Sequence, residues 1–207
     1  MKRLLFCATS LAIAVMCLSD VQALERDSFQ GSSEESMASD APKYFPEVVG
    51  RNLEGLEFQL PRDFSGAVNL VLVAFRREQQ ATVDTWLAPA AALADSFDNL
   101  HYYELPVLNR GYILARPVID GGMRAGIADL EARERTVTLY IDKGPFREAL
   151  GISSENTIYV LVLGPEGRVS LMLDGAYSKS KGSAVERAVW EMLDSQAFPS
   201  EEERASD

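Results

Sequence analysis

TVTLYID at residues 136–142 and TIYVLVL at residues 157–163 are two strand-like runs within the stretch that decides the fold, residues 136–193. The first run alternates and is rich in β-branched and aromatic residues, as in a pleated, half-buried strand. The second is unbroken and apolar, which predicts a strand buried on both faces. A short helix over residues 146–150 is expected between them.

The remainder of this stretch predicts a hairpin and a closing helix. Gly164-Pro165-Glu166-Gly167 turns the chain into a strand at residues 168–173, which ends at Gly175. A helix from Ala184 to Leu193 follows, with Val185, Val189, Met192 and Leu193 on its apolar side. This order resembles the C-terminal half of the thioredoxin-like superfamily, including its hairpin, here Glu166-Gly167-Arg168-Val169. The resemblance implies an α/β fold with a central mixed sheet flanked by helices.

Upstream segments extend the same pattern. Residues 56–60 alternate like an edge strand that Pro61 closes, and residues 68–75 form an apolar central strand. A helix is predicted over residues 82–97, with Pro89 kinking it. Its expected inward face is Val83, Trp86, Leu87, Ala90, Ala91, Ala94 and Phe97. A strand at residues 101–105 and a helix at residues 129–135 complete the elements.

The two ends of the chain differ in composition from this core. Residues 1–23 have a basic start, an apolar middle and the small-residue site Val21-Gln22-Ala23, which predicts a secretory signal peptide. Residues 24–43 are interpreted as a disordered linker, residues 44–197 as the thioredoxin-like domain and residues 198–207 as an acidic tail. The protein is expected in the periplasm or secreted, or held at the membrane if the signal is not cleaved.

Cysteine content and charge exclude several classes of function. Both cysteines, Cys7 and Cys17, lie inside the signal, so the mature chain offers no disulfide, thiolate nucleophile or cysteine-bound metal. Signal removal takes away two cations and one carboxylate, which moves the formal charge from −11 to −12. So acidic a surface argues against nucleic acid and anionic lipid as partners. We predict no cofactor and no metal.

The thioredoxin resemblance implies a redox site whose parts are replaced in this sequence. Counting back from the helix proline places Ala81-Thr82-Val83-Asp84 where those enzymes carry Cys-x-x-Cys. Ala74 stands at the position of their buried carboxylate, and Asn156 at that of their cis-proline. A trans bond is expected before Asn156, because a cis bond to a residue other than proline costs about 3 kcal/mol. The prediction is a redox-inactive protein that is not an enzyme.

Other catalytic patterns are weak. His101 is the single histidine and is interpreted as a structural or surface residue. The glycines of residues 121–126 have phosphate-loop spacing, but Ile127-Ala128 replaces the lysine and hydroxyl residue, so we expect a flexible loop. An enzyme that uses Asp84, Glu155 or His101 would need two of them close together in a water-poor cleft.

A polar cluster follows the central strand and forms the candidate binding cleft. Arg76 and Arg77 stand next to a helix N-terminus in an acidic protein, where they could bind a carboxylate or an acidic segment of a partner. The alternative is surface pairing with Glu78 or Asp84. The candidate cleft residues are Arg76, Arg77, Gln79, Gln80, Asp84, Glu155 and Asn156.

Residues 70–177 carry a narrower resemblance. The segments LVLVAFR at 70–76, YELPVL at 103–108, GMR at 122–124 and TLYID at 138–142 are similar to the thioredoxin-like assembly factors of the mitochondrial ATP synthase and their bacterial relatives. That resemblance implies a non-enzymatic assembly factor or chaperone for a membrane complex. Our leading hypothesis is therefore an exported protein that binds another protein, and the alternative is a small-anion or ligand-binding module that uses the cleft.

Overall fold

A computed structural model describes residues 42–197 of the protein. The predicted signal, the acidic tail and all but the last two residues of the predicted linker lie outside the described residues. The strands are β1 (Val48–Asn52), β2 (Glu57–Leu60), β3 (Val68–Ala74), β4 (Leu100–Asn109), β5 (Val137–Ile141), β6 (Tyr159–Leu163) and β7 (Val169–Asp174). The α-helices are α1 (Gln80–Ala94), α2 (Arg116–Gly126), α3 (Leu130–Arg135), α4 (Lys143–Leu150) and α5 (Lys179–Ala197). Short 3₁₀ helices η1 (Arg77–Gln79), η2 (Arg110–Ala115) and η3 (Pro165–Gly167) join them.

All seven strands form one mixed sheet in the order β2-β1-β5-β4-β3-β6-β7. Strand β4 runs parallel to both β3 and β5, whereas the other neighbours are antiparallel. The predicted central and edge strands, β3 and β2, occupy those positions. Strand β1 was not predicted from the sequence, because its five residues form a strand only by pairing with neighbouring strands.

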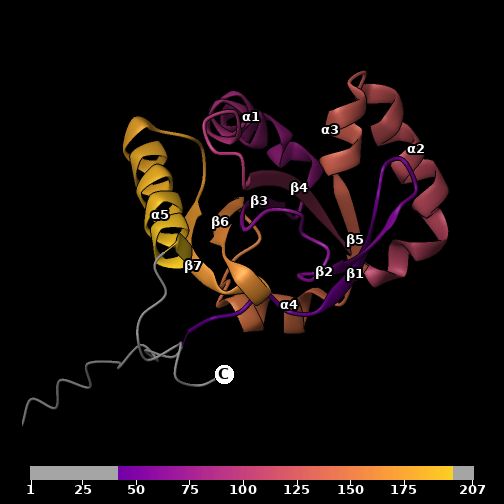
Figure 1. Cartoon of the computed structure of the whole chain (residues 1–207). Coiled ribbons are helices and arrows are strands. Elements are labelled where there is room, and N and C mark those ends of the chain that lie inside the picture. Colours follow the sequence, from indigo (N-terminus) through magenta and orange to yellow (C-terminus); the bar gives the residue numbers. More distant parts are fainter. Residues whose placement is uncertain (1–41, 198–207) are drawn as a thin grey trace, which may run out of the picture. The chain divides into compact units, whose positions relative to one another are not determined.

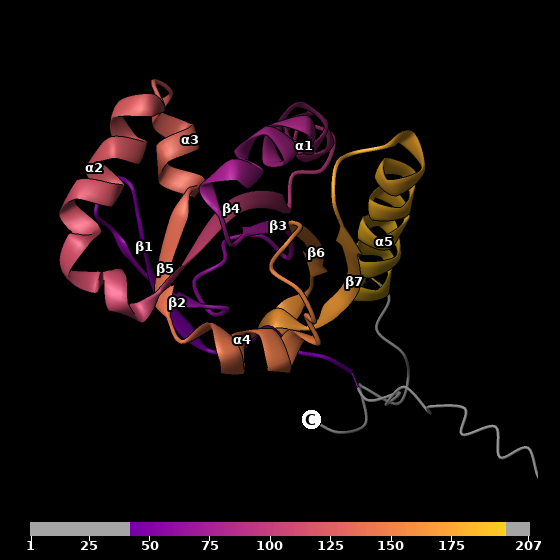
Figure 2. The same ribbon diagram turned by 180° about the vertical axis from the view of Figure 1, so that it is seen from behind.

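Helices cover both faces of this sheet (Figures 1 and 2). On one face α1 and α5 pack through Val83, Trp86, Val185 and Val189, which belong to one buried cluster. On the other face α4 contributes Phe146 and Leu150 to a second cluster. Side chains of β6 alternate between the two clusters and all five residues are buried, which confirms the strand buried on both faces.

Four elements are longer or begin earlier than predicted, among them α4, which begins at Lys143 rather than at residue 146. Helix α1 begins at Gln80, and α5 extends over 19 residues. Strand β4 continues through Pro106 to Asn109. Up to Pro106 it pairs with β3, and from Val107 it pairs with β5, so the partner strands rather than propensity set its length.

The glycine-rich segment at residues 121–126 is not the predicted flexible loop. It forms the second half of helix α2, whose first turn contains Pro117. Glycine weakens a helix by about 1 kcal/mol per residue without preventing one. Contacts from Asp120 to Tyr140 and from Arg124 to Glu54 hold this helix against the domain.

Candidate functional site

The candidate site lies where β3 ends and α1 begins, and Gln79 stands at its centre. Gln79 is buried, with 8% of its surface exposed. Its Oε1 accepts hydrogen bonds from the backbone N–H groups of Phe75 (2.8 Å) and Arg76 (3.2 Å). Its Nε2 donates to the carbonyl oxygen of Glu155 at 2.8 Å. One side chain therefore joins the strand-to-helix turn to a loop 76 residues further along the chain.

The loop that carries Glu155 is held from its other side by helix α4. The Glu155 carboxylate pairs with Lys143 Nζ at 3.0 Å and with Arg147 Nη1 at 3.4 Å. Arg147 also donates to the carbonyl oxygens of Ile152 and Ser153. Asp142 begins the helix, since its side chain accepts from Gly144 N–H. The loop is thus fixed by polar contacts to both η1 and α4.

Arg76 and Arg77, which were predicted to line the cleft, are exposed at the edge of this corner. Neither Arg76 nor Arg77 forms an ion pair within residues 42–197, so the alternative of pairing with Glu78 or Asp84 is not seen. Asp84 instead accepts a hydrogen bond from Gln80 at 2.9 Å along the surface of α1. The corner therefore presents two unpaired cations on an acidic protein.

The structure brings together only part of the predicted cleft. Gln79 contacts the Glu155 backbone, and Gln80 contacts Asp84, whereas Asn156 is exposed and its N–H donates to Ser154 Oγ. The one cis peptide bond in the described chain is Leu60–Pro61, so the bond before Asn156 is trans as predicted.

Residues at the expected Cys-x-x-Cys position lie in the first turns of α1. Val83 is buried there in the α1–α5 core cluster, whereas Ala81 and Asp84 are exposed. None of the four residues at 81–84 carries a thiol, as the sequence shows. Ala74 is half-buried at the end of β3.

A buried carboxylate nevertheless lies beneath this helix, and the sequence analysis missed it. Glu104 of β4 sits opposite Leu72 of β3 and is 7% exposed. Burial raises the pKa of its carboxyl above the usual value, while nearby Arg135 and Gln80 lower this pKa and Asp84 raises it. In the strand alternation Glu104 shares a face with Tyr102, but the residues that act on its carboxyl come from two other elements, α1 and α3.

Lys143 and Arg147 were also missed. They are four residues apart on α4, which places both on one side of that helix, toward Glu155. Lys143 also lies 5.7 Å from the centre of the Phe75 ring. Their i, i+4 spacing was visible in the sequence, but the acidic partner was not.

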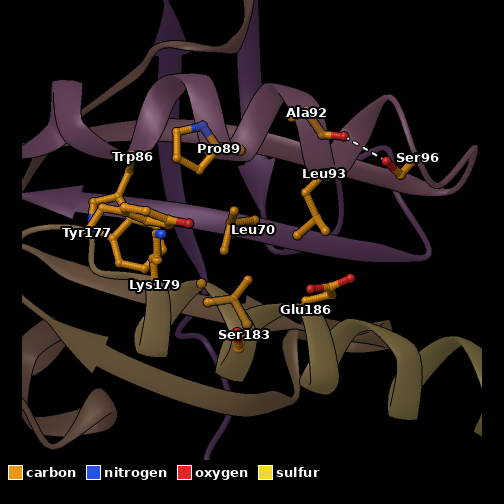
Figure 3. A pocket seen from close by; sticks show the side chains of 13 residues that line it. Leu70, Trp86, Pro89, Ala92, Leu93, Ser96, Tyr177, Lys179, Ser183 and Glu186 are labelled. Atoms are coloured by element: carbon orange, nitrogen blue, oxygen red, sulfur yellow. Dashed lines mark hydrogen bonds between the residues drawn. The ribbon is translucent and has the colours of Figure 1, made fainter.

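Two surface hollows lie away from this corner. One, of about 420 Å³, runs between α1 and α5 over Leu70 of β3 (Figure 3). Trp86 and Tyr177 stand at one end, with ring centroids 5.1 Å apart, and Glu186 lies toward the other. The second, of about 770 Å³, includes His101, Tyr102 and Arg135. Neither is lined by Arg76, Arg77 or Asn156, so neither supports the predicted small-anion site.

His101 is exposed on β4, as its interpretation as a surface residue predicted. Its neighbours in the second hollow do not include Asp84 or Glu155, so the three proposed catalytic groups are not gathered there. Within residues 42–197, no helix is long and apolar enough to span a membrane.

Three solved structures illustrate the fold to which this chain is similar. A putative electron transport protein from Aquifex aeolicus VF5 matches with a TM-score of 0.50 at 14% identity, over 70% of this chain and 96% of that chain. BsSco, of the Sco family of cytochrome c oxidase assembly proteins, matches with a TM-score of 0.49 at 14% identity, over 71% and 94%. A putative thiol:disulfide interchange protein DsbE from Chlorobium tepidum matches with a TM-score of 0.48 at 15% identity, over 74% and 98%. No protein-family model and no curated protein matches the sequence. The chain therefore has a thioredoxin-like fold, as predicted.

These neighbours correct one prediction. The sequence analysis concluded that the chain is not an enzyme, yet thiol:disulfide interchange proteins are enzymes and stand among its structural neighbours. That conclusion is wrong as drawn, because a missing Cys-x-x-Cys removes one chemistry and not catalysis in general.

Yeast Sco1, a further neighbour at 12% identity, was solved with copper bound. Within the described residues of this chain, no group of three or more His, Cys, Asp or Glu side chains is placed to hold a metal ion.

Proposed function

We propose that this chain is an exported thioredoxin-like protein that binds another protein and assists the assembly of a membrane complex. The proposal takes its client class from the resemblance to the ATP synthase assembly factors. The binding surface in this proposal is the corner around Gln79, where β3 ends and α1 begins. Binding there needs no thiol from the described residues.

The observation that carries the proposal is the exposed, unpaired pair Arg76 and Arg77 on a rigid base. The Gln79 side chain holds the backbone of Arg76, so the attachment point of this side chain is fixed before a partner arrives. A fixed backbone leaves only side-chain freedom to be lost on binding. An acidic segment is the complementary partner for two adjacent arginines.

Helix α1 adds to the attraction of this corner for carboxylates. The first N–H groups of a helix are unpaired within it, and the helix dipole favours negative charge at this end. Arginine also binds carboxylates in a bidentate manner, which orients the partner. Lys143 and Arg147, although engaged by Glu155, keep the neighbouring surface cationic.

The test is crosslinking of the exported protein in its own cells, followed by mass spectrometry. We expect a specific client that is lost in the Arg76→Glu, Arg77→Glu double variant. The matched control is Arg168→Glu with Arg187→Glu, two exposed arginines elsewhere on the domain that form no ion pair within residues 42–197. Both double variants should keep a nearly unchanged free energy of unfolding, because all four residues are exposed.

Recovery of no client would overturn the proposal. Recovery of the same clients from the wild type and the Arg76, Arg77 variant would also remove this corner as the binding surface. Loss of the client in both double variants would show that general surface charge, rather than this corner, controls the interaction.

A further inference from the structure

We infer that helix α2 and the preceding η2 form a surface on which a second copy of this chain docks. The segment is unusual because none of its residues in η2 or α2 is buried. It nonetheless carries four large exposed apolar side chains. They are Tyr112 (57% exposed), Ile113 (42%), Leu114 (92%) and Val118 (79%).

Helix α2 exposes apolar side chains outside, although its inner side already contacts the domain. Polar groups make these contacts: Arg116 lies over the Tyr140 ring, Asp120 accepts from the Tyr140 hydroxyl at 2.8 Å, and Arg124 pairs with Glu54 at 3.0 Å. Ile119 and Met123 are half-buried, whereas Val118 stays exposed. An exposed apolar patch of this kind is characteristic of a surface that a partner covers.

The outer face is complementary to itself. Its N-terminal half carries the large residues Leu114 and Val118, and its C-terminal half carries Gly121, Gly122 and Ala125. A Cβ built on Gly121 or Gly122 meets no atom within 4 Å, so the space above them is open. Antiparallel pairing about a two-fold axis would set the large half of each copy against the small half of the other.

The charges at the two ends of this surface fit the same arrangement. Exposed Arg110 precedes the large half, and exposed Asp129 and Glu131 follow the small half. Antiparallel pairing brings Arg110 of one copy to the end that carries the carboxylates of the other, and also toward the negative end of the opposing helix dipole. Leu130, half exposed, extends the apolar surface at that end.

The surface is small, so the dimer is weak. Four large side chains from each copy would bury on the order of 1,000 Å², the lower limit for a specific interface. The dissociation constant is accordingly expected above roughly 1 µM. Association should therefore be visible only at high protein concentration.

The experiment is sedimentation of the chain as exported by the cell, over a wide range of concentration. We expect a monomer–dimer equilibrium that Val118→Ser weakens roughly tenfold or more, because both copies lose a buried side chain. Leu56→Ser is the matched control, since Leu56 is 63% exposed on a different element. It should leave the equilibrium unchanged.

Gly122→Leu separates loss of pairing from loss of folding. The open space above Gly122 and the higher helix propensity of leucine predict a melting temperature equal to or above that of the wild type. The same side chain would block close approach of the second helix and abolish the dimer. A stable Gly122→Leu chain that still dimerises would overturn the proposal.

Exchanging two charged residues tests the antiparallel register of the dimer. Arg110→Glu should weaken the dimer, and Arg110→Glu combined with Glu131→Arg should restore it. Failure of the double variant to recover would contradict antiparallel pairing. A wild-type chain that stays monomeric overturns the proposal outright. Photocrosslinks from position 118 to a different protein, or binding of neutral phospholipid vesicles by the monomer, would assign this face to that partner instead.

Discussion

The Gln79 corner and the α2 segment are built in opposite ways. At the corner, a buried amide accepts from the N–H groups of Phe75 and Arg76, donates to the carbonyl oxygen of Glu155, and has exposed cations beside it. In η2 and α2, charged groups contact the domain while large apolar side chains such as Leu114 and Val118 lie exposed, and no residue of either segment is buried. The comparison shows that buried polar contacts make the Gln79 corner rigid, whereas the α2 segment leaves an apolar surface uncovered.

The largest expected effect is at the corner. Gln79→Leu keeps the volume but leaves two backbone N–H groups and one carbonyl without their partner. We expect the free energy of unfolding to fall by about 3 kcal/mol, measured by urea denaturation. Glu78→Gln is the control, because Glu78 is exposed on the same 3₁₀ helix and its replacement should change stability by no more than about 0.5 kcal/mol. Equal midpoints for the two variants would show that the Gln79 contacts are replaced by water.

Helix α2 should respond to removal of a single hydroxyl. Tyr140→Phe removes the hydrogen bond to Asp120, one of the polar contacts that hold α2. We expect amide hydrogen exchange in α2 to become roughly tenfold faster, equivalent to about 1 kcal/mol of local stability, while β3 and β6 are unaffected. Equally faster exchange in β3 would mean that α2 and the sheet open together, which would erase the difference between the two regions.

Glu155→Gln tests the ion pairs of the corner without removing the Gln79 contact to its backbone. Lys143, Arg147 and Glu155 keep partial exposure, between 18% and 30%, so screening limits their contribution. We expect a loss of no more than about 1 kcal/mol in the free energy of unfolding, and a smaller loss at high salt. A loss that is independent of salt would indicate packing, rather than charge, as the role of Glu155.

The smallest change is expected from Glu104→Gln. It should appear in the slope of stability against pH rather than in the midpoint of unfolding. Burial raises the pKa of Glu104 above its usual 4.5, so the folded chain keeps a proton that the unfolded chain has already released. Its contribution to stability therefore falls as pH rises from the unfolded pKa through the folded pKa. The variant should show a flatter pH dependence there and be at least as stable at neutral pH. Glu191→Gln, on the exposed side of α5, is the control, and parallel curves for all three proteins would contradict the role of burial.

Much of the fold was predictable because periodicity is local. The unbroken apolar run at 157–163 required a strand with two covered faces, and β6 has them. Strand β1 and the extension of β4 past Pro106 were not predictable, since pairing with other strands creates both. The α2 glycines were misread because their penalty is small beside the contacts of Asp120 and Arg124.

At the candidate site, the sequence predicted a pair of arginines beside a helix N-terminus, and the structure shows both exposed there, but the groups that hold this corner were not predicted. Gln79 was expected to bind a ligand, and the structure shows it bonded to the protein itself. Lys143, Arg147 and Glu104 were missed because their partners are distant in the sequence or on other strands.

By itself, the sequence determined the order of most strands and helices and the absence of cysteine after Cys17, because hydrophobic period and residue identity are properties of the chain. Only the tertiary structure decided that Gln79 and Glu104 are buried and that Leu114 and Val118 lie exposed. Burial, hydrogen bonding and helix orientation depend on which surfaces meet across the sheet, and those surfaces come from segments that a local pattern does not connect.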